Sequence, residues 1–334
     1  MLLSIIIVNY KSSAQIIDCI NSAMQYSSVK LFEWIVVDNA SNDNSEQDIM
    51  SRFPFVQWLP MGYNAGFARA NNQGIRQSKG DVVLLLNPET LVMDDCIKTC
   101  FEKFIETDYV ACGLQLYYPN GKPQISGNFF MKGGLNHLLP LPYWGKLLRT
   151  IAFAVKVKKT NVEKAATVEE VDWISGAFLM VKKTAIEKAG LMDEDFFLYA
   201  EEVEWCSRLM KHGKLCIFGE MAITHIGGQT INQVTDAEDE TYEGLFDKKG
   251  LQLMVSNHVR IRKQYGTAWF LFQLLNYTIA VPIFFIGSFM EHLFKLRNPF
   301  SDFSRATGLL KNVVKVWLLA PTIISNKPHF YKMF

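Results

Sequence analysis

An acidic and an amide side chain stand two positions apart at the end of a strongly apolar run. Residues 82–90 read VVLLLNPET, so the aliphatic residues stop at Asn87, Pro88 and Glu89. In extended backbone, side chains two positions apart point the same way, and Pro88 stiffens the backbone between them. Oxygen ligands held like this suit a hard divalent cation that also binds phosphates. A strand that runs into an ordinary Pro-containing turn accounts for the same residues, and from them alone both interpretations stand.

The elements that would position these side chains alternate between strand and helix patterns. The strand-like runs are 2–8, 34–38, 56–59 and 82–87, and the helical patterns between them are 14–25, 45–52 and 67–78. Repeated short strand–helix units predict a mostly parallel sheet with right-handed crossovers. Such sheets bind ligands at the carboxyl ends of their strands. We therefore expect a nucleotide-binding α/β region in the first third of the chain.

Polar and small residues follow each of the first three predicted strands. They are Asn9-Tyr10, Asp38–Ser45 and Gly62–Gly66. The Asp38 carboxylate can accept the ring N–H of a uracil or thymine, and glycine allows backbone N–H groups to approach a phosphate closely. An Asx-rich turn followed by a helix cap fits residues 38–45 as well. The sequence contains no GxGxxG after the first strand and no GxxxxGK[ST], which argues against a dinucleotide oxidoreductase and a P-loop enzyme.

A second group of candidate residues lies between Asp193 and Arg208. Three acidic residues, 193–195, precede the aromatic block 196–199, and further carboxylates open a helix at 201–204. Acidic residues are favoured in a first helical turn whatever their function. Their number and the adjacent rings exceed what a helix start requires, and the rings could pack on sugars. Glu204 and Arg208 are four positions apart, which predicts a structural ion pair.

Composition limits the partners and the compartment. Lys and Arg number 34 against 33 Asp and Glu, a net charge of +1, so no overall field attracts nucleic acid. The six cysteines form no CxxC pair, which favours reduced, buried thiols in a cytoplasmic protein. The first residues lack the features of a secretory signal.

The apolar excess lies in the C-terminal third. Residues 264–290 contain no charged side chain and could cross a bilayer core of about 30 Å. Gln273, Asn276 and Pro282 interrupt the segment, and basic residues flank both ends, which disfavours a single span. We expect a helix in the membrane interface or a re-entrant hairpin bent near Pro282, with a second helix at 309–324 on the same leaflet. An interface between copies of a homo-oligomer is the alternative.

A mixed basic and apolar segment occupies residues 127–168, where the strand–helix pattern breaks down. It fits a solvated basic loop, an amphipathic element on an anionic membrane surface, or a lid over a bound donor.

Six motifs, in order, resemble family 2 glycosyltransferases of the rhamnosyltransferase-like branch. They are SIIIVNYK (4–11), IVVDNASND (35–43), NAGFARANNQGI (64–75), LLLNPET (84–90), WISGAFLMVKK (173–183) and DEDFFLYAEEVEWCSRL (193–209). The resemblance covers roughly residues 1–230 and implies a GT-A fold. It further implies inverting transfer of a sugar, rhamnose or another hexose, from a nucleoside diphosphate sugar in the presence of Mg²⁺ or Mn²⁺. The acceptor would be a glycan or a polyprenyl-linked glycan in cell-surface polysaccharide synthesis.

The resemblance also assigns roles to residues of this sequence. Glu202 becomes the catalytic base, with Glu201 as the alternative, and Glu89 and His225 become metal or diphosphate ligands. Asn87 and Glu89 stand where the family has Asp-x-Asp, and Glu202 stands where it has Asp, so the ligand and the base are each one methylene longer. The implied donor-binding residues are Val8, Asn9, Tyr10, Asp38, Asn39, Asn64, Gly66, Arg69, Asn87, Trp173 and Gly176.

The predicted organisation is an α/β catalytic domain at 1–235 and a helical membrane-associating region at 236–334. Within the first, the nucleotide-binding half ends near residue 115 and the acceptor half follows. The expected location is the cytoplasmic face of a bacterial inner membrane.

Two rival functions remain open at this point. A sugar nucleotidyltransferase should carry a Gly-rich loop with Arg and Lys where Asn9-Tyr10-Lys11 stands, and a catalytically silent membrane scaffold would tolerate the two changes from Asp to Glu.

Overall fold

The computed structural model describes residues 1–26, 31–154, 156, 160–227 and 244–334. These residues form two compact units. The α/β unit comprises 1–129, 161–197 and 201–231, and the helical unit comprises 130–160, 198–200 and the residues from 232 to 334. The boundary predicted at residue 235 and part of the mixed basic and apolar segment, residues 155 and 157–159, lie outside the described residues.

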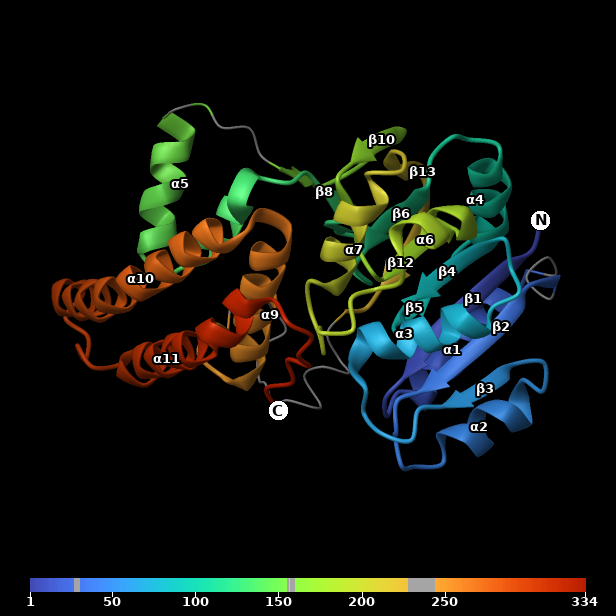
Figure 1. The fold of residues 1–334 in the computed structure, drawn as a ribbon, viewed down its shortest axis with the longest axis horizontal. Helices are drawn as coiled ribbons and strands as arrows, with labels where there is room; N and C mark the ends of the chain where they lie inside the picture. Colours follow the sequence, from blue (N-terminus) through green and yellow to red (C-terminus); the bar gives the residue numbers. More distant parts are fainter. Residues whose placement is uncertain (27–30, 155, 157–159, 228–243) are drawn as a thin grey trace. The chain divides into compact units, whose positions relative to one another are not determined.

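The α/β unit is built on one large mixed sheet (Figure 1). Its strands lie in the order β10-β13-β6-β12-β4-β1-β2-β3, with β5 paired to β13 and β7 paired to β6. The neighbours β4, β1, β2 and β3 are parallel, as are β13 and β6, whereas β12 runs antiparallel between β4 and β6. The expected mostly parallel sheet is therefore confirmed. The strands are β1 Leu3–Asn9, β2 Glu33–Asp38, β3 Gln57–Pro60, β4 Val82–Leu86, β5 Thr90–Leu91, β6 Ala111–Tyr117, β7 Pro123–Gln124, β10 Val168–Val171, β12 Phe178–Lys182 and β13 Leu215–His225.

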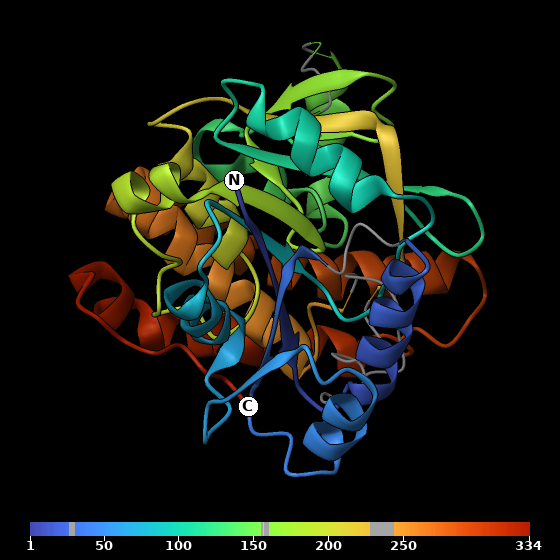
Figure 2. The ribbon, with the colours of Figure 1, turned by 90° about the vertical axis from the view of Figure 1, so that its right-hand side faces the viewer.

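Helices cover both faces of this sheet, which explains why its central strands are apolar without interruption. Ile5 and Ile7 of β1 belong to one core cluster with apolar residues of α1, α2 and α4. Ile6 points to the other face, where α3 comes so close that a Cβ on Gly74 would lie 2.5 Å from Ile6 Cγ2. Figure 2 shows α1 and α2 side by side. The helices of this unit named so far are α1 Ser13–Met24, α2 Ser45–Arg52, α3 Gly66–Gln77 and α4 Cys96–Ile105.

A smaller sheet and two helices complete the α/β unit. The small sheet has the order β11-β8-β9, from β8 Gly127–Asn128, β9 Asn161–Val162 and β11 Trp173–Ile174. Helix α7, Glu201–Leu209, packs against β11, α3 and α6, Lys183–Ala189. All six cysteines of the chain are buried and free, as the sequence predicted.

The helical unit is a bundle in which α9, α10 and α11 pack on one another (Figure 1). Its helices are η2 Lys132–Leu138, α5 Trp144–Ala154, α9 Lys248–Tyr265, α10 Thr267–Phe294 and α11 Phe303–Ser325. Gly266, with φ of +92°, separates α9 from α10 in a conformation that glycine adopts readily. Helix α10 continues through Pro282, so the re-entrant hairpin expected at this proline does not form. By length and composition alone, α10 and α11 could each cross a membrane.

Candidate functional site

Asn9 and Asp38 meet where β1 and β2 end. They are register partners in the parallel pair, and Asn9 Nδ2 donates to Asp38 Oδ1 at 2.8 Å. The Ser41 hydroxyl donates to the same oxygen at 2.6 Å, whereas Asp38 Oδ2 accepts a longer bond of 3.3 Å from the Ser41 amide. The carboxylate is thus held in one orientation at the strand end. Of the neighbouring candidates, Val8 has a buried side chain and Tyr10 is partly buried.

Asn39 and Asn64 connect the end of β2 to the start of α3. Asn39 Oδ1 accepts from the Ala65 amide at 2.7 Å, and Asn39 Nδ2 donates to Asn64 Oδ1 at 3.1 Å. Gly66 has φ of +77°, and a Cβ there would lie 2.3 Å from the Phe197 carbonyl oxygen. The close approach at Gly66 is made by Phe197, and the Gly66 amide donates to Asn64 Oδ1, while the donor-binding role of Gly66 stays a prediction.

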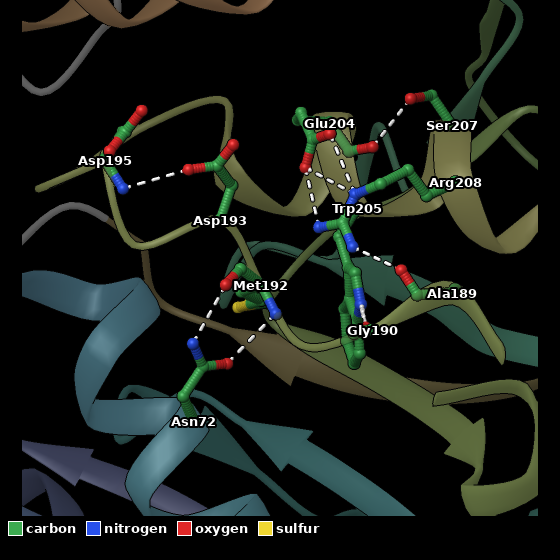
Figure 3. Close-up of polar contacts among 10 residues, drawn as sticks. All are labelled: Asn72, Ala189, Gly190, Met192, Asp193, Asp195, Glu204, Trp205, Ser207 and Arg208. Carbon is green, nitrogen blue, oxygen red and sulfur yellow. Dashed lines mark hydrogen bonds and ion pairs between the residues drawn. The ribbon is translucent and has the colours of Figure 1, made fainter. Parts of the chain in front are cut away.

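Helix α3 also holds the loop that precedes α7. Arg69 Nε donates to the Glu194 carbonyl at 3.0 Å, and Arg76 forms an ion pair with the Glu194 carboxylate at 2.6 Å. Asn72 bonds both the amide and the carbonyl of Met192, as Figure 3 shows. The rings of the aromatic block at Phe196, Phe197 and Tyr199 are buried, so the expectation that they pack on sugars is wrong.

Asn87, Glu89 and His225 converge at the carboxyl end of β4. His225 is the register partner of Thr90 in the pairing of β13 with β5, and the Ile226 amide donates to the Glu89 carbonyl at 2.9 Å. Asn87 Nδ2 lies 3.4 Å from His225 Nε2. Glu89 is buried, and its charge acts on the His225 ring. The sequence-predicted set of metal ligands is therefore brought together by the fold.

Gln124 fixes the tautomer of His225. Its Oε1 lies 3.0 Å from His225 Nδ1, and its Nε2 donates to the His225 carbonyl. An amide oxygen can only accept, so Nδ1 carries the proton and Nε2 keeps its lone pair on the side of Asn87. Burial lowers the pKa of His225, although the Glu89 charge opposes this effect. The imidazole is therefore neutral and competent as a ligand at neutral pH.

These residues fit a divalent cation that shares its ligands with a substrate. The Asn87 amide contacts the His225 imidazole, and the Glu89 charge acts on this ring, whereas within the described residues no three His, Cys, Asp or Glu lie close enough to hold a metal ion themselves. Mg²⁺ is commonly bound by one or two carboxylates together with substrate phosphates. A pocket of about 190 Å³ borders Glu89 and is lined by Ala14, Gln15, Asp18, Pro88, Glu89, Thr90, Leu91 and Ile226.

Gly176 brings a third group of residues together. A Cβ added at Gly176 would make ordinary contacts, 3.7 Å from the Phe67 ring and 3.8 Å from Glu202 Cβ. The segment between β11 and β12 therefore lies beside the first turn of α7. Trp173 on β11 is only partly buried, so core packing does not fully account for it.

Glu201 and Glu202 differ in their surroundings although they are adjacent. Glu201 is 3% exposed, and within the described part of the chain its Oε2 has no hydrogen-bond partner. Burial, together with the Glu202 charge, raises the pKa of Glu201 well above that of an ordinary carboxyl. Glu202 is only partly buried. Glu201 therefore holds its proton more tightly than an ordinary carboxyl does, and Glu202 is the more accessible of the two.

Glu204, in the same helical turn, has a structural role together with Arg208 and Trp205. Arg208 contacts both carboxylate oxygens of Glu204, at 2.8 Å in the closest ion pair, and its Nη1 donates to the Ala189 carbonyl (Figure 3). Trp205 Nε1 donates to the Gly190 carbonyl at 2.8 Å. The predicted ion pair between Glu204 and Arg208 is confirmed, and it fixes α7 against the end of α6.

Two residues of the site were not predicted. Ser41 lies in a motif that the sequence analysis quoted, and a hydroxyl in an Asx-rich turn is a recognisable signal. Gln124 is separated from His225 by 101 positions and stands in no motif, so only the pairing of β7 with β6 and of β6 with β13 brings them together.

Comparison with known proteins agrees with the geometry. Residues 4–155 match the model of glycosyl transferase family 2. The hexosyltransferase Agl10 of low-salt glycan biosynthesis in Haloferax volcanii is 30% identical over 62% of this chain and 61% of its own length. An N-acetylglucosaminyl-diphospho-decaprenol L-rhamnosyltransferase of Mycobacterium tuberculosis is 28% identical over 55% of this chain and 62% of its own.

These similarities cover only part of the relatives' length, and a solved structure shares the fold. The matches cover about three fifths of the length of those two relatives. The crystal structure of GalNAc-T7 with UDP, GalNAc and Mn²⁺ has a TM-score of 0.50 and 13% identity, over 81% of this chain and 56% of that one. This similarity concerns the fold alone and agrees with the expected GT-A architecture. With its motifs in order, its GT-A fold and these relatives, the chain carries a glycosyl transferase family 2 domain at residues 4–155, and rhamnosyltransferases are among the proteins it resembles.

Proposed function

We propose that this protein transfers a hexosyl or rhamnosyl group from a nucleoside diphosphate sugar to a glycan acceptor, with inversion at the anomeric carbon. The observation that carries the proposal is the convergence of Asn87, Glu89 and His225 at the end of β4, on the same sheet edge as Asp38. A hydrolase of simple esters or a scaffold has no need of this combination of base-binding and diphosphate-binding groups.

The nucleoside is assigned to the ends of β1 and β2. Asp38, oriented by Asn9 and Ser41, accepts the ring N–H of a uracil or thymine. Asn39 and Asn64 act indirectly, because their side chains shape the loop that leads into α3. Arg69 lies on the first turns of α3 and, with Trp173 and Gly176, completes the donor set.

The diphosphate is assigned to the end of β4. Glu89 and His225 Nε2 would hold Mg²⁺ or Mn²⁺, with Asn87 beside them and diphosphate oxygens filling the remaining positions. The cation, when bound, neutralises the charge that develops on the leaving nucleoside diphosphate. Gln124 keeps the His225 proton on Nδ1, so that Nε2 keeps the lone pair a cation would need, which Asn87 Nδ2 approaches to 3.4 Å in this structure.

Glu202 is assigned as the general base. Its carboxylate takes the proton of the acceptor hydroxyl while that oxygen forms a bond to the anomeric carbon and the bond from this carbon to the diphosphate breaks. Glu201 supports this role, since its raised pKa disfavours a second negative charge beside the base. Gly176 leaves room for the sugar next to Glu202.

The acceptor is assigned to a lipid-linked glycan at the cytoplasmic face of a membrane. The name of the Mycobacterium tuberculosis relative gives a decaprenyl diphosphate-linked sugar as its acceptor. Two long apolar helices in this chain support a membrane location. A role in cell-surface polysaccharide synthesis follows from such an acceptor.

The test is turnover of a panel of uridine, thymidine and guanosine diphosphate sugars, with and without Mn²⁺. The wild type is compared with Glu202→Gln and with Glu187→Gln, an exposed carboxylate on the neighbouring helix α6. We expect one donor to be consumed in a metal-dependent manner by the wild type and by Glu187→Gln, and not by Glu202→Gln. If no donor turns over with detergent and lipid acceptor extracts, the scaffold alternative gains support instead.

A further inference from the structure

Large exposed apolar side chains are concentrated on α10, α11 and the turn between them. Leu296 is 94% exposed and Phe294 is 78% exposed, and Phe300 and Phe303 are also exposed in the same turn. Further along, Ile286 on α10 and Leu318 on α11 are exposed. Soluble proteins rarely leave a continuous apolar surface of this kind uncovered.

Each of the two helices has a buried apolar face and an exposed apolar face. On α10 the exposed residues Leu271, Leu275, Ile279, Ile286 and Leu293 recur at intervals of four and seven, which places them on one side of the helix. Their neighbours Phe270, Leu274 and Tyr277 are buried. A helix that is apolar all round needs a second covering in addition to its own bundle.

The turn between α10 and α11 is held in a defined shape. Ser288 Oγ donates to Asp302 at 2.8 Å, and His292 Nε2 lies 3.1 Å from the same carboxylate. The rings of Phe289 and Phe300 lie 5.8 Å apart. Polar groups therefore fasten the turn from within, while Leu296 and Phe294 remain outside.

The charges around this surface are predominantly positive. Residues 264–334 contain seven Lys or Arg and only two acidic residues, Glu291 and Asp302. Both acids are engaged inside the unit, Glu291 with Tyr143 and Lys295, and Asp302 with Ser288 and His292. Arg297, Lys311 and Lys315 are exposed beside the apolar residues. The surface is thus complementary to a layer that is apolar within and anionic at its boundary.

Helix α5 adds to this surface. It contacts α10 through Tyr143, just before its start, and through Trp144, whose Nε1 donates to Asn276 Oδ1 at 3.0 Å. Leu147 and Ile151 of α5 are exposed apolar residues, and Lys146 and Arg149 lie among them. The amphipathic membrane element that the sequence suggested in this segment is therefore part of the same unit as α10.

The inner faces of α10 and α11 are occupied by polar contacts with protein. Gln273 Nε2 donates to the Gly133 and Gly134 carbonyls, and Asn312 Nδ2 donates to the Leu245 and Asp247 carbonyls. A membrane-spanning helix here would have to give up these bonds or carry its polar partners into the lipid. The outer face is the one left for lipid, which argues against a simple span.

We propose that the outer face of α5, α10, α11 and the 295–302 turn is a monotopic binding surface for an anionic lipid bilayer. The helices lie in the plane of the interface, and Phe294, Leu296 and Phe300 enter the acyl boundary. This inference deepens the membrane part of the proposed function. It rests on the proposed function only in so far as the lipid surface would present a lipid-linked acceptor. Lipid binding is measured without any nucleotide sugar, so its failure can be distinguished from a failure of sugar transfer.

The first test is cosedimentation of the full chain with phosphatidylcholine vesicles, with or without phosphatidylglycerol. We expect binding to vesicles that contain phosphatidylglycerol, at least tenfold weaker for Leu296→Asp/Phe300→Asp. The control is Met93→Asp, an equally large exposed side chain in the α/β unit. Arg297→Glu/Lys311→Glu/Lys315→Glu should remove the preference for phosphatidylglycerol. Thermal melting checks that each variant is folded.

The second test distinguishes an in-plane helix from a spanning one. Nitroxide labels on cysteines introduced at Leu271, Ile279, Ile286 and Leu293 report depth, and the native cysteines are buried and do not compete. We expect one shallow depth for all four positions. A steady gradient from one side of the bilayer to the other would overturn the proposal.

A second copy of this chain is the competing occupant of the surface. If Leu296→Asp/Phe300→Asp turns an oligomer into a monomer in light scattering while vesicle binding stays unchanged, the surface is an oligomer interface and the proposal is wrong. Vesicle binding that is equal in the wild type and in this variant overturns it as well.

Discussion

Two carboxylates in the first turn of α7 have opposite surroundings. Glu204 is buried but bonded to Arg208, which in turn bonds the Ala189 carbonyl. Glu201 is also buried, and its Oε2 has no hydrogen-bond partner within the described residues. Burying a carboxylate without a counter-charge costs stability, and such sites concentrate where chemistry takes place. The contrast supports a structural role for Glu204 and the proposed functional role of the pair Glu201 and Glu202.

The largest expected effect is on turnover, and it probes Glu202. Glu202→Gln removes the proposed base but keeps size and hydrogen-bonding capacity, so kcat should fall by about 10²–10⁴-fold with little change in donor affinity. Donor affinity measured by calorimetry separates the two effects. A parallel loss of kcat and of donor binding would contradict the assignment of Glu202 as the base.

The next effect is on the free energy of unfolding, and it probes the ion pair between Glu204 and Arg208. Glu204→Ala leaves the partly buried Arg208 without its carboxylate, so the free energy of unfolding should fall by about 3 kcal/mol. Denaturation by urea measures this, with Glu187→Ala as the exposed control on α6. The donor affinity of the folded fraction should be unchanged. A loss of under 0.5 kcal/mol would place Glu204 among surface ion pairs of little consequence.

A smaller effect is expected on metal affinity. It concerns His225, which is hydrogen-bonded to Gln124, as Glu204 is to Arg208, and is also a proposed metal ligand. Gln124→Leu removes the acceptor for the Nδ1 proton, so affinity for Mn²⁺ in the presence of a nucleoside diphosphate should fall about 10–100-fold. Gln124→Glu, which still accepts this proton, is the matched control. Calorimetry measures binding, and ¹⁵N chemical shifts of the imidazole should show a mixed tautomer in Gln124→Leu alone.

The smallest effect concerns the pH dependence of stability. Because the pKa of Glu201 is raised in the folded state, the folded state binds a proton at this carboxyl more tightly than the unfolded state does. Stability from this group is complete below the carboxyl pKa of the unfolded chain and is lost as pH rises through the higher pKa of the folded state. Glu201→Gln should therefore gain stability relative to the wild type as pH rises above about 4.5. Urea midpoints between pH 4 and 8 test this, and parallel curves would mean that Glu201 is ionised in the fold.

Local patterns in the sequence predicted much of the fold and part of the site. Strand and helix positions in the first third differ by only a residue or two from those observed, because burial on both faces imposes continuous apolar runs on strands. The ion pair between Glu204 and Arg208 was predictable because residues four apart on a helix always lie on one face. The strand-end positions of Asn9, Asp38 and Asn87 followed from the same argument.

The roles of several predicted residues depended on contacts that no local pattern contains. Gly66 faces Phe197, and the aromatic block at 196–199 turned out to be buried. A glycine with positive φ allows either a phosphate or a carbonyl group to approach the backbone closely, and the local sequence does not indicate which of the two does so. Pro282 did not interrupt α10, because a proline within a helix can be accommodated when the rest of the helix is held by packing.

The sequence by itself determined the alternation of strands and helices, the polar strand ends, the family motifs and the existence of an apolar C-terminal region. These properties depend on residues close together in the chain, where spacing alone sets direction. Only the tertiary structure decided that Gln124 orients His225, that Glu201 is buried beside an accessible Glu202, and which face of α10 is left exposed. Strand order, register and helix packing set these relations, because they join side chains that are far apart in the sequence.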